Sequence, residues 1–203
     1  MLRIDKDGMV HSALVRLRRF STLERAAMPV VHGIIVHQTG GATAQSTFNS
    51  YQQSIYGAHF LIDKDGTIYQ TASLYRRTNH VGLLRSRCIA RHSCKPAELK
   101  ALQKTGPRGE NRREQRKDFP DRFPANRDSI GIELVGEYNP NPEFGKVRGA
   151  DEYVYVSVTD AQNASLRWLV GQLRSTLEVA AGEVYRHPTV SFKTSSEAAT
   201  ASW

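Results

Sequence analysis

Residues 30–41 read VVHGIIVHQTGG, a short apolar run followed directly by a polar, glycine-rich end. The apolar run Gly33–Val36 is short, rich in β-branched residues and bounded by glycines, which is typical of a buried central strand. The polar sequence HQTGG follows at once, beginning with His37. A histidine at the end of a core strand is held rigidly and stays accessible, as a metal ligand or a catalytic base must be. A lone histidine is more often structural, so the other segments of the chain decide between these readings.

Length and composition favour one globular domain. The 203 residues suffice for one sizeable core and hardly for two, so we expect a single domain over residues 1–203. No run approaches the ~20 apolar residues of a membrane helix, so no membrane insertion is expected. The first thirty residues lack the apolar core of a secretory signal. We therefore expect synthesis in the cytoplasm without a signal peptide.

The chain is basic, with a formal net charge of +8 and a pI near 9.7. Such a surface attracts nucleic acid, anionic lipid or acidic cell-wall polymers. Much of the positive charge falls in residues 83–127, where apart from a short helical pattern at 97–104 the apolar residues are too few for a second core. We predict that 83–127 is a basic surface insertion and a contact surface. It lacks the interleaved aromatic residues that stacking on bases requires, so a nucleic-acid partner is not expected.

Outside the insertion, strand and helix patterns alternate. Helices are predicted over 43–55 and from a Thr159 cap to residue 179 or 180, with Gly182 as the C-terminal cap. A hairpin is predicted over 58–70, turning at Asp65-Gly66. Further strands are expected at 129–136, 153–158 and 184–188. The interleaving predicts an α/β fold with a mixed central β-sheet flanked by helices.

Four short motifs occur in a fixed order along this chain. They are the strand ending in His37-Gln38-Thr39, the segment AHFLID at 58–63 with DG at 65–66, Asn126 with SIGIELVG at 129–136, and Arg186-His187-Pro188 followed by Lys193. Together they resemble the zinc-dependent N-acetylmuramoyl-L-alanine amidases. That family includes phage amidase lysozymes, bacterial anhydro-muramyl amidases and the peptidoglycan recognition proteins. The resemblance covers roughly residues 30–200 apart from the insertion.

The resemblance implies the fold of this family and a role for several residues. His37 and His187 would be Zn²⁺ ligands, Glu133 the general base that takes a proton from the attacking water, and Lys193 the cation that supports the oxyanion. The residue types agree, because a catalytic zinc keeps three protein ligands and a charged residue inside an apolar strand is costly unless it is paired or functional. The phage-type enzymes carry a tyrosine where this chain has Ala58, which places the chain nearer the anhydro-muramyl type.

The third ligand is where the sequence departs from the family. There an Asp or Cys follows the second histidine by about ten residues, two after a lysine. In this chain Ser195 lies two after Lys193, whereas Glu197 lies ten after His187. We favour Glu197, because zinc prefers an anionic oxygen to a serine hydroxyl. His59 and His80 are the fallback ligands.

A rival zinc motif involves both cysteines of the chain. His80, Cys88, His92 and Cys94 lie within fifteen residues and could hold a structural zinc. Their spacing matches no established zinc pattern. A disulfide between Cys88 and Cys94 and a pair of free thiols both stay open.

The resemblance thus implies zinc-dependent hydrolysis of the amide between N-acetylmuramic acid and L-alanine, in peptidoglycan or a muropeptide. The enzyme would act as an antibacterial effector or a lysis enzyme in the periplasm or on the wall of a target cell, with a secretion-system or immunity protein as a further partner. The alternative is a peptidoglycan recognition module that binds without cutting. Ser195 favours that alternative, whereas Glu133 and Lys193 disfavour it.

Overall fold

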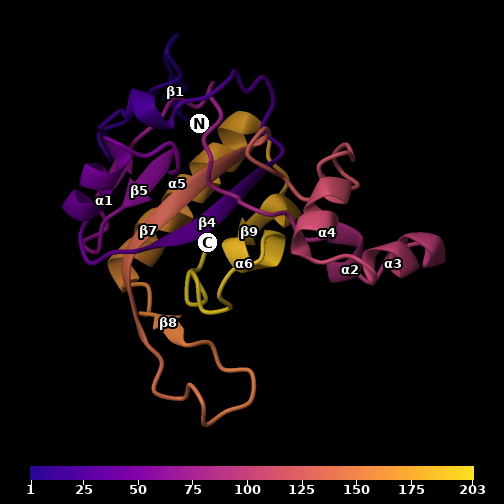
Figure 1. Ribbon diagram of the computed structural model, residues 1–203. Helices are drawn as coiled ribbons and strands as arrows, with labels where there is room; N and C mark the ends of the chain where they lie inside the picture. The colour runs from indigo at the N-terminus through magenta and orange to yellow at the C-terminus, as the bar shows by residue number, and fades with distance from the viewer.

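The computed structural model describes all residues from 1 to 203 and places a mixed sheet at the centre of the molecule (Figure 1). Its strands lie in the order β3 (Val15–Leu17), β6 (Ile68–Gln70), β5 (Phe60–Ile62), β7 (Ser129–Pro140), β4 (Gly33–Gly40) and β9 (Val184–Arg186), and β8 (Tyr153–Tyr155) pairs with β7. A separate two-stranded ribbon joins β1 (Arg3–Ile4) to β2 (Val10–His11). The predicted α/β class with a mixed sheet is confirmed.

Helices cover both faces of the sheet. The long helix α5 (Asp160–Leu177) packs on one face, whereas α1 (Ala44–Tyr51) and α6 (His187–Val190) pack on the other. The remaining helices belong to the insertion or are single 3-10 turns: α2 (Arg87–Ala90), α3 (Pro96–Leu102), α4 (Pro107–Glu114), η1 (Ser21–Leu23) and η2 (Ala181–Glu183). Not one of these helices has both the length and the apolar character needed to cross a bilayer.

The two faces follow from the alternation of side chains along each strand. In β4, Ile34 and Val36 lie in the large core cluster under α5. Ile35 points the opposite way, into the cluster that includes Val190 of α6. His37 therefore lies on the face away from α5, as does Glu133, which alternates with Ile132 in β7.

Parallel pairing sets three strands side by side at the site. Strand β4 runs parallel to β7 on one side and to β9 on the other. The register sets His37 opposite Glu133 and Val36 opposite Arg186, so that His187 follows directly at the end of β9. The carboxyl ends of parallel strands are a common location for ligand sites in α/β proteins.

Most predicted elements are present, but several of their ends differ. The helix predicted over 43–55 ends at Tyr51, and β9 ends at Arg186, so His187 begins α6 instead of lying in the strand predicted over 184–188. Thr43 caps α1, and Thr159 and Gln162 form the expected capping box at the start of α5. The predicted cap at Gly182 is wrong: α5 ends at Leu177 because Glu178 adopts a left-handed conformation with φ of +57°. Gly182 lies instead in η2, four residues further on.

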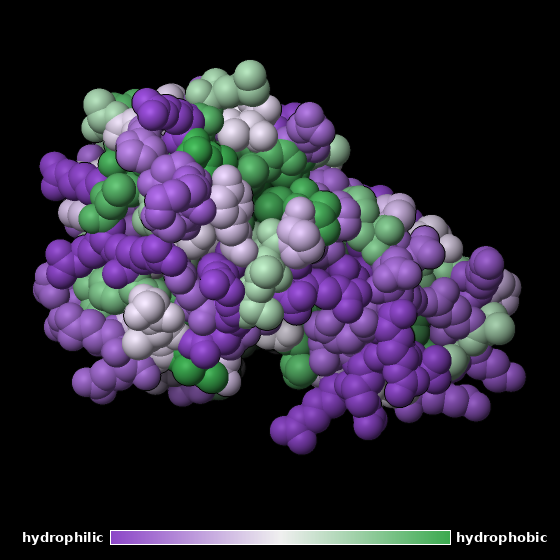
Figure 2. Space-filling model, turned by 90° about the horizontal axis from the view of Figure 1, so that it is seen from above, coloured by the Kyte–Doolittle hydropathy of each residue, from purple (hydrophilic) through white to green (hydrophobic).

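The insertion projects from the body of the protein and carries α2, α3 and α4 (Figure 1). Seen from above, it forms a hydrophilic protrusion on one side of the molecule (Figure 2). A disulfide joins Cys88 to Cys94. Buried Arg87 anchors α2 to the body, since its Nη1 donates to Glu183 Oε2 at 3.0 Å. The disulfide uses both cysteines, which removes them from the rival zinc motif.

Candidate active site

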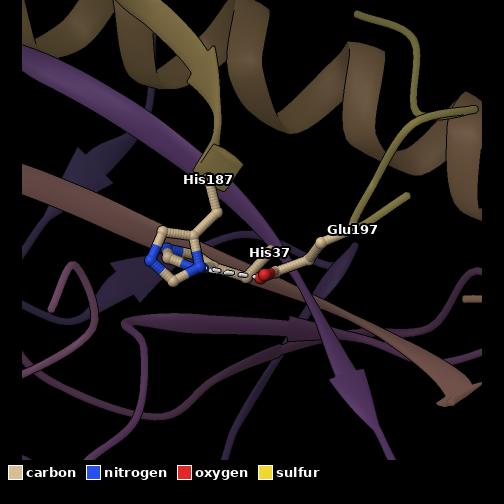
Figure 3. A group of neighbouring side chains, drawn as sticks. All are labelled: His37, His187 and Glu197. Atoms are coloured by element: carbon tan, nitrogen blue, oxygen red, sulfur yellow. Dashed lines mark hydrogen bonds and ion pairs between the residues drawn. The ribbon is translucent and has the colours of Figure 1, made fainter. Parts of the chain in front are cut away.

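Three donor side chains converge from separate parts of the chain on the face away from α5 (Figure 3). His37 comes from β4, His187 from the start of α6, and Glu197 from the loop after α6. The ligand atoms all lie within 4.8 Å of one another, and all three side chains are buried. Glu197 Oε1 is 2.8 Å from His187 Nδ1 and 3.6 Å from His37 Nδ1.

The protonation of this group follows from its surroundings. Burial is the main reason that the pKa of His37 falls to about 4, and the neighbouring His187 lowers it further. Burial alone would raise the pKa of Glu197, but its contacts with the two histidines lower it to about 2. At neutral pH the group therefore presents a carboxylate to a neutral His37.

The donor set fits a metal cation. The Nε2–H of His187 donates to the carbonyl oxygen of Val81 at 2.8 Å, and a carbonyl can only accept. The other ring nitrogen of His187, Nδ1, faces Glu197 Oε1. A lone pair and a carboxylate at 2.8 Å repel one another unless a proton or a metal cation lies between them. Two imidazole nitrogens and one carboxylate oxygen are ligands typical of catalytic zinc.

Glu133 and Lys193 line the same cleft, which has a volume of about 620 Å³. Glu133 Oε2 is enclosed and has no hydrogen-bond partner. Burial and the negative charge of Glu197 raise the pKa of Glu133 to about 8, and the cation of Lys193 opposes this shift. A carboxyl group with a free oxygen and a pKa near neutrality can exchange a proton with a substrate or with water.

The other candidate ligands lie elsewhere. Ser195 is exposed, and its hydroxyl donates to Asp151 at 3.2 Å. His59 is buried behind the cleft, where its ring hydrogen-bonds the Arg76 carbonyl and the Gly131 N–H. His80 lines the cleft but contacts His37 rather than joining the donor group. The structure thus brings together His37, His187 and Glu197, with Glu133 and Lys193 beside them.

Sequence reasoning missed several residues of the cleft. Tyr51 from α1 and Tyr155 from β8 line it, although their positions in the sequence match ordinary core and edge-strand patterns. The carbonyl of Val81, which orients His187, leaves no trace in a sequence because every residue has one. The polar cluster Asn79–Gly82, which ends in glycine, was the available signal for this segment.

The chain is similar to known proteins both in sequence and in fold. A family model described as N-acetylmuramoyl-L-alanine amidase matches residues 26–200. Among proteins with curated functions, no match was found. Solved structures with a similar fold include selenomethionine AmpD (19% identity, TM-score 0.53, covering 93% of this chain and 88% of AmpD). The catalytic domain of XlyA (17%, 0.51, 88% and 87%) and PlyL (18%, 0.50, 88% and 84%) are also similar. At these identities the structural likeness concerns the fold alone.

Proposed function

The chain belongs to the N-acetylmuramoyl-L-alanine amidase family, and from this premise we propose that it is a zinc-dependent hydrolase of peptidoglycan. The bond cleaved is the amide between the lactyl group of N-acetylmuramic acid and L-alanine of the stem peptide. The observation that carries the proposal is the convergence of His37, His187 and Glu197 next to the unpartnered carboxylate of Glu133.

His37, His187 and Glu197 hold the Zn²⁺ ion in this proposal. When bound, zinc acts as a Lewis acid toward the scissile carbonyl and acidifies water. These three residues would supply three protein ligands on the wall of the cleft, and no fourth protein ligand belongs to the group. An open position is what distinguishes a catalytic zinc site from a structural one.

Glu133 and Lys193 carry out the proton transfer and the charge stabilisation. Glu133 takes a proton from the attacking water and returns it to the amine of L-alanine as the amide breaks. Lys193 reaches the cleft from the loop after α6 and donates to the carbonyl oxygen as negative charge develops there. The raised pKa of Glu133 suits a group that must both accept and release a proton near neutral pH.

The test is to measure zinc and product on the same preparation. Elemental analysis of the purified chain should give close to one zinc per molecule, and the protein should release stem peptides with a free L-alanine amine from purified sacculi. Glu133→Gln is the control for contaminating activity, because it should keep zinc and release no peptide. Zinc-loaded protein that binds sacculi without releasing peptides would instead identify a recognition module.

The residues of the cleft favour an enzyme over a recognition module that only binds. The case for such a module rested on the serine at position 195, where the family has a ligand. Glu197 now occupies a place in the donor group that Ser195 does not. Glu133 and Lys193 also face the cleft, and a module that only binds needs neither.

We also infer that the protein acts outside a reducing cytoplasm, on the wall of a target cell, as an effector or a lysis enzyme. The Cys88–Cys94 disulfide supports this inference, because disulfides persist in the periplasm and on cell surfaces. Delivery by a secretion apparatus and neutralisation by an immunity protein belong to the same proposal. Producing the chain with and without an added export signal tests it: lysis should occur only when the protein reaches the periplasm.

The basic insertion would supply the first contact with the wall. Residues 83–127 contain 13 Lys or Arg and 5 Asp or Glu, a net charge of +8 that equals the net charge of the whole chain. Lys104, Arg108 and Arg112 line a hollow of about 610 Å³ that begins at Leu83, next to Gly82 of the catalytic cleft. Cations beside the cleft fit a polymer whose stem peptides carry carboxylates.

A further inference from the structure

One dipeptide lies behind both candidate ligand histidines. The outer nitrogen of His37, Nε2, is 2.9 Å from Nδ1 of His80. The outer nitrogen of His187, also Nε2, is 2.8 Å from the carbonyl oxygen of Val81. The two histidines come from strand ends far apart in sequence, yet consecutive residues contact their outer sides. Both inner Nδ1 atoms are thereby left to face Glu197.

The hydrogen positions in this network can be deduced from its far end. His80 Nε2 faces two oxygens of Ser129, the carbonyl at 3.3 Å and the hydroxyl at 3.2 Å. That hydroxyl already donates its proton to the Ala125 carbonyl at 2.7 Å, so both oxygens can only accept from His80. His80 therefore carries its hydrogen on Nε2, and its bare Nδ1 accepts from His37 Nε2–H. The consequence is a bare Nδ1 on His37, the form that binds a metal.

The dipeptide itself is fixed from behind. Asn126 Oδ1 accepts from the backbone N–H of His80 at 2.9 Å and from that of Val81 at 2.8 Å. Gly131 of β7 leaves room for the His80 ring, because a Cβ at that position would lie 2.8 Å from Cγ and Nδ1 of His80. The Asn126 side chain thus holds the backbone of the dipeptide, and Gly131 leaves space for the His80 ring.

We propose that His80, Val81 and Asn126 act as a positioning unit that sets the tautomer and orientation of His37 and His187 for metal binding. The inference rests on the proposed function insofar as the metal is zinc. It assigns His80 a role in orienting a ligand, in place of the role as a ligand considered from the sequence. Partners of this kind typically change metal affinity by about 10- to 100-fold when they are removed.

Two substitutions at His80 test the unit. His80→Asn keeps an acceptor close to the position of Nδ1, whereas His80→Leu fills similar space without one. The dissociation constant for zinc, measured by competition with a chromophoric chelator, should rise about 10- to 100-fold in His80→Leu and by only a few-fold in His80→Asn. His32→Leu is the matched control, because His32 pairs with Asp128 before β4 begins and contacts neither candidate ligand.

A second measurement needs no metal. Nitrogen-15 NMR of the histidine rings in metal-free protein should show His37 with hydrogen on Nε2 and a bare Nδ1, in the wild type and in His80→Asn. His80→Leu should give a mixture of tautomers. Rescue by asparagine and a tautomer signal are readouts that a general loss of stability would not produce.

The outcomes separate this inference from the proposed function. Hydrogen on Nδ1 of His37 in the wild type, or equal zinc affinity in wild type and His80→Leu, overturns the positioning unit. A wild type that binds no zinc overturns the zinc proposal, and the NMR result alone then decides the positioning unit. If His80→Leu does not fold, the wild-type and His80→Asn spectra still give the decision.

Discussion

The carboxylate of Glu197 is the only negative charge in the donor group, since both partners are imidazoles. Replacing Glu197 by alanine leaves two neutral nitrogens, a far weaker set for a divalent cation. We expect Glu197→Ala to lower zinc affinity on the order of 100-fold or more. Ser195→Ala, two residues away and turned toward Asp151, should change it little. Isothermal titration of zinc into metal-free protein measures both.

Alanine at His37 or at His187 should also abolish stoichiometric zinc while leaving the fold intact, as circular dichroism can verify. The ligand assignment would be wrong if Glu197→Ala retained tight zinc while Ser195→Ala lost it. It would be equally wrong if either histidine variant kept full zinc content by elemental analysis.

Glu133 allows a prediction about turnover. Glu133→Gln is nearly isosteric but cannot take up a proton at neutral pH, so zinc and sacculus binding should persist. The rate of peptide release should fall by roughly 10² to 10⁴. Near-native turnover in this variant would mean that Glu133 only supports its strand. Asp151→Asn, an exposed carboxyl on the loop before β8, is a matched control that should leave the rate unchanged.

The same carboxyl makes the stability of the metal-free protein depend on pH. The pKa of Glu133 is about 8 in the folded state, against an ordinary value of 4.5 that applies on unfolding. The folded state therefore binds the proton more tightly, and its advantage is complete below pH 4.5 and is lost as pH rises toward 8. Glutamine does not ionise, so Glu133→Gln should not lose this stability as the pH rises. Urea unfolding should show the variant gaining stability relative to wild type from pH 5 to pH 8, by about 1–3 kcal/mol. A constant difference across that range would contradict the shift.

At the scale of elements, the site exists because three parallel strands lie side by side, with Glu133 inside β7, His37 opposite it in β4 and His187 directly after β9. Strand patterns and spacing were enough to predict β4, β7 and β9, and with them the positions of His37, Glu133 and His187. The spacing of apolar residues along the chain indicates which side chains are buried, and this pattern identifies the strands of the core. The register that sets His37 opposite Glu133 is a tertiary property, and the sequence could only make it plausible.

What the sequence could not reveal depends on contacts between distant segments. Val81 acts through its backbone carbonyl, and Asn126 acts on backbone N–H groups 45 and 46 residues away, so neither role has a residue-type signature. The helix end at Glu178 was missed because a non-glycine residue took the left-handed conformation there. Glu197 was favoured over Ser195 on chemistry, because spacing alone left both eligible, and its carboxylate lies within 4.8 Å of both histidine donors.

The cap of α5 offers a test at this scale. The Thr159 hydroxyl accepts from the Gln162 N–H at 3.1 Å and donates to the Lys64 carbonyl at 2.8 Å, which ties the helix start to the β5–β6 turn. Thr159→Ala should lower the free energy of unfolding by about 1 kcal/mol or somewhat more. Thr159→Ser keeps both hydrogen bonds and should lose much less. Zinc affinity should be the same in both variants, because α5 covers the face away from the site; a lower affinity in either would show that the helix supports the donor group.

At the scale of the whole molecule, charge is divided unequally. The body outside residues 83–127 contains 15 Lys or Arg and 15 Asp or Glu, so the insertion accounts for the entire net charge. Several of its cations are committed to structure: Arg87 pairs with Glu183, Arg122 with Asp128, and Lys117 with two glutamates. Other cations of the insertion face solvent on the protrusion of Figure 2. The body of the molecule therefore has no net charge, and the insertion beside the cleft carries the positive net charge.

This asymmetry predicts that binding to the wall and catalysis can be separated. Lys104, Arg108 and Arg112 are exposed and have no ion-pair partner, and replacing all three by glutamine removes charge without disturbing a buried pair. Affinity for purified sacculi in low-salt buffer should fall roughly tenfold, because opposite charges steer and hold a polyanion at the surface. Added salt should reduce the difference, since the Debye length shrinks to about 8 Å near 0.15 M. The control is the triple replacement of Arg3, Lys6 and Arg16, exposed cations of the N-terminal segment of which Lys6 has an exposed partner, Asp7; it should leave sacculus binding unchanged. Zinc content and the unfolding midpoint should stay at wild-type values in both triple variants, so that a loss of binding reports charge alone. If both triple variants lost the same affinity for sacculi, the net charge of the protein, and not the position of the insertion, would attract the wall.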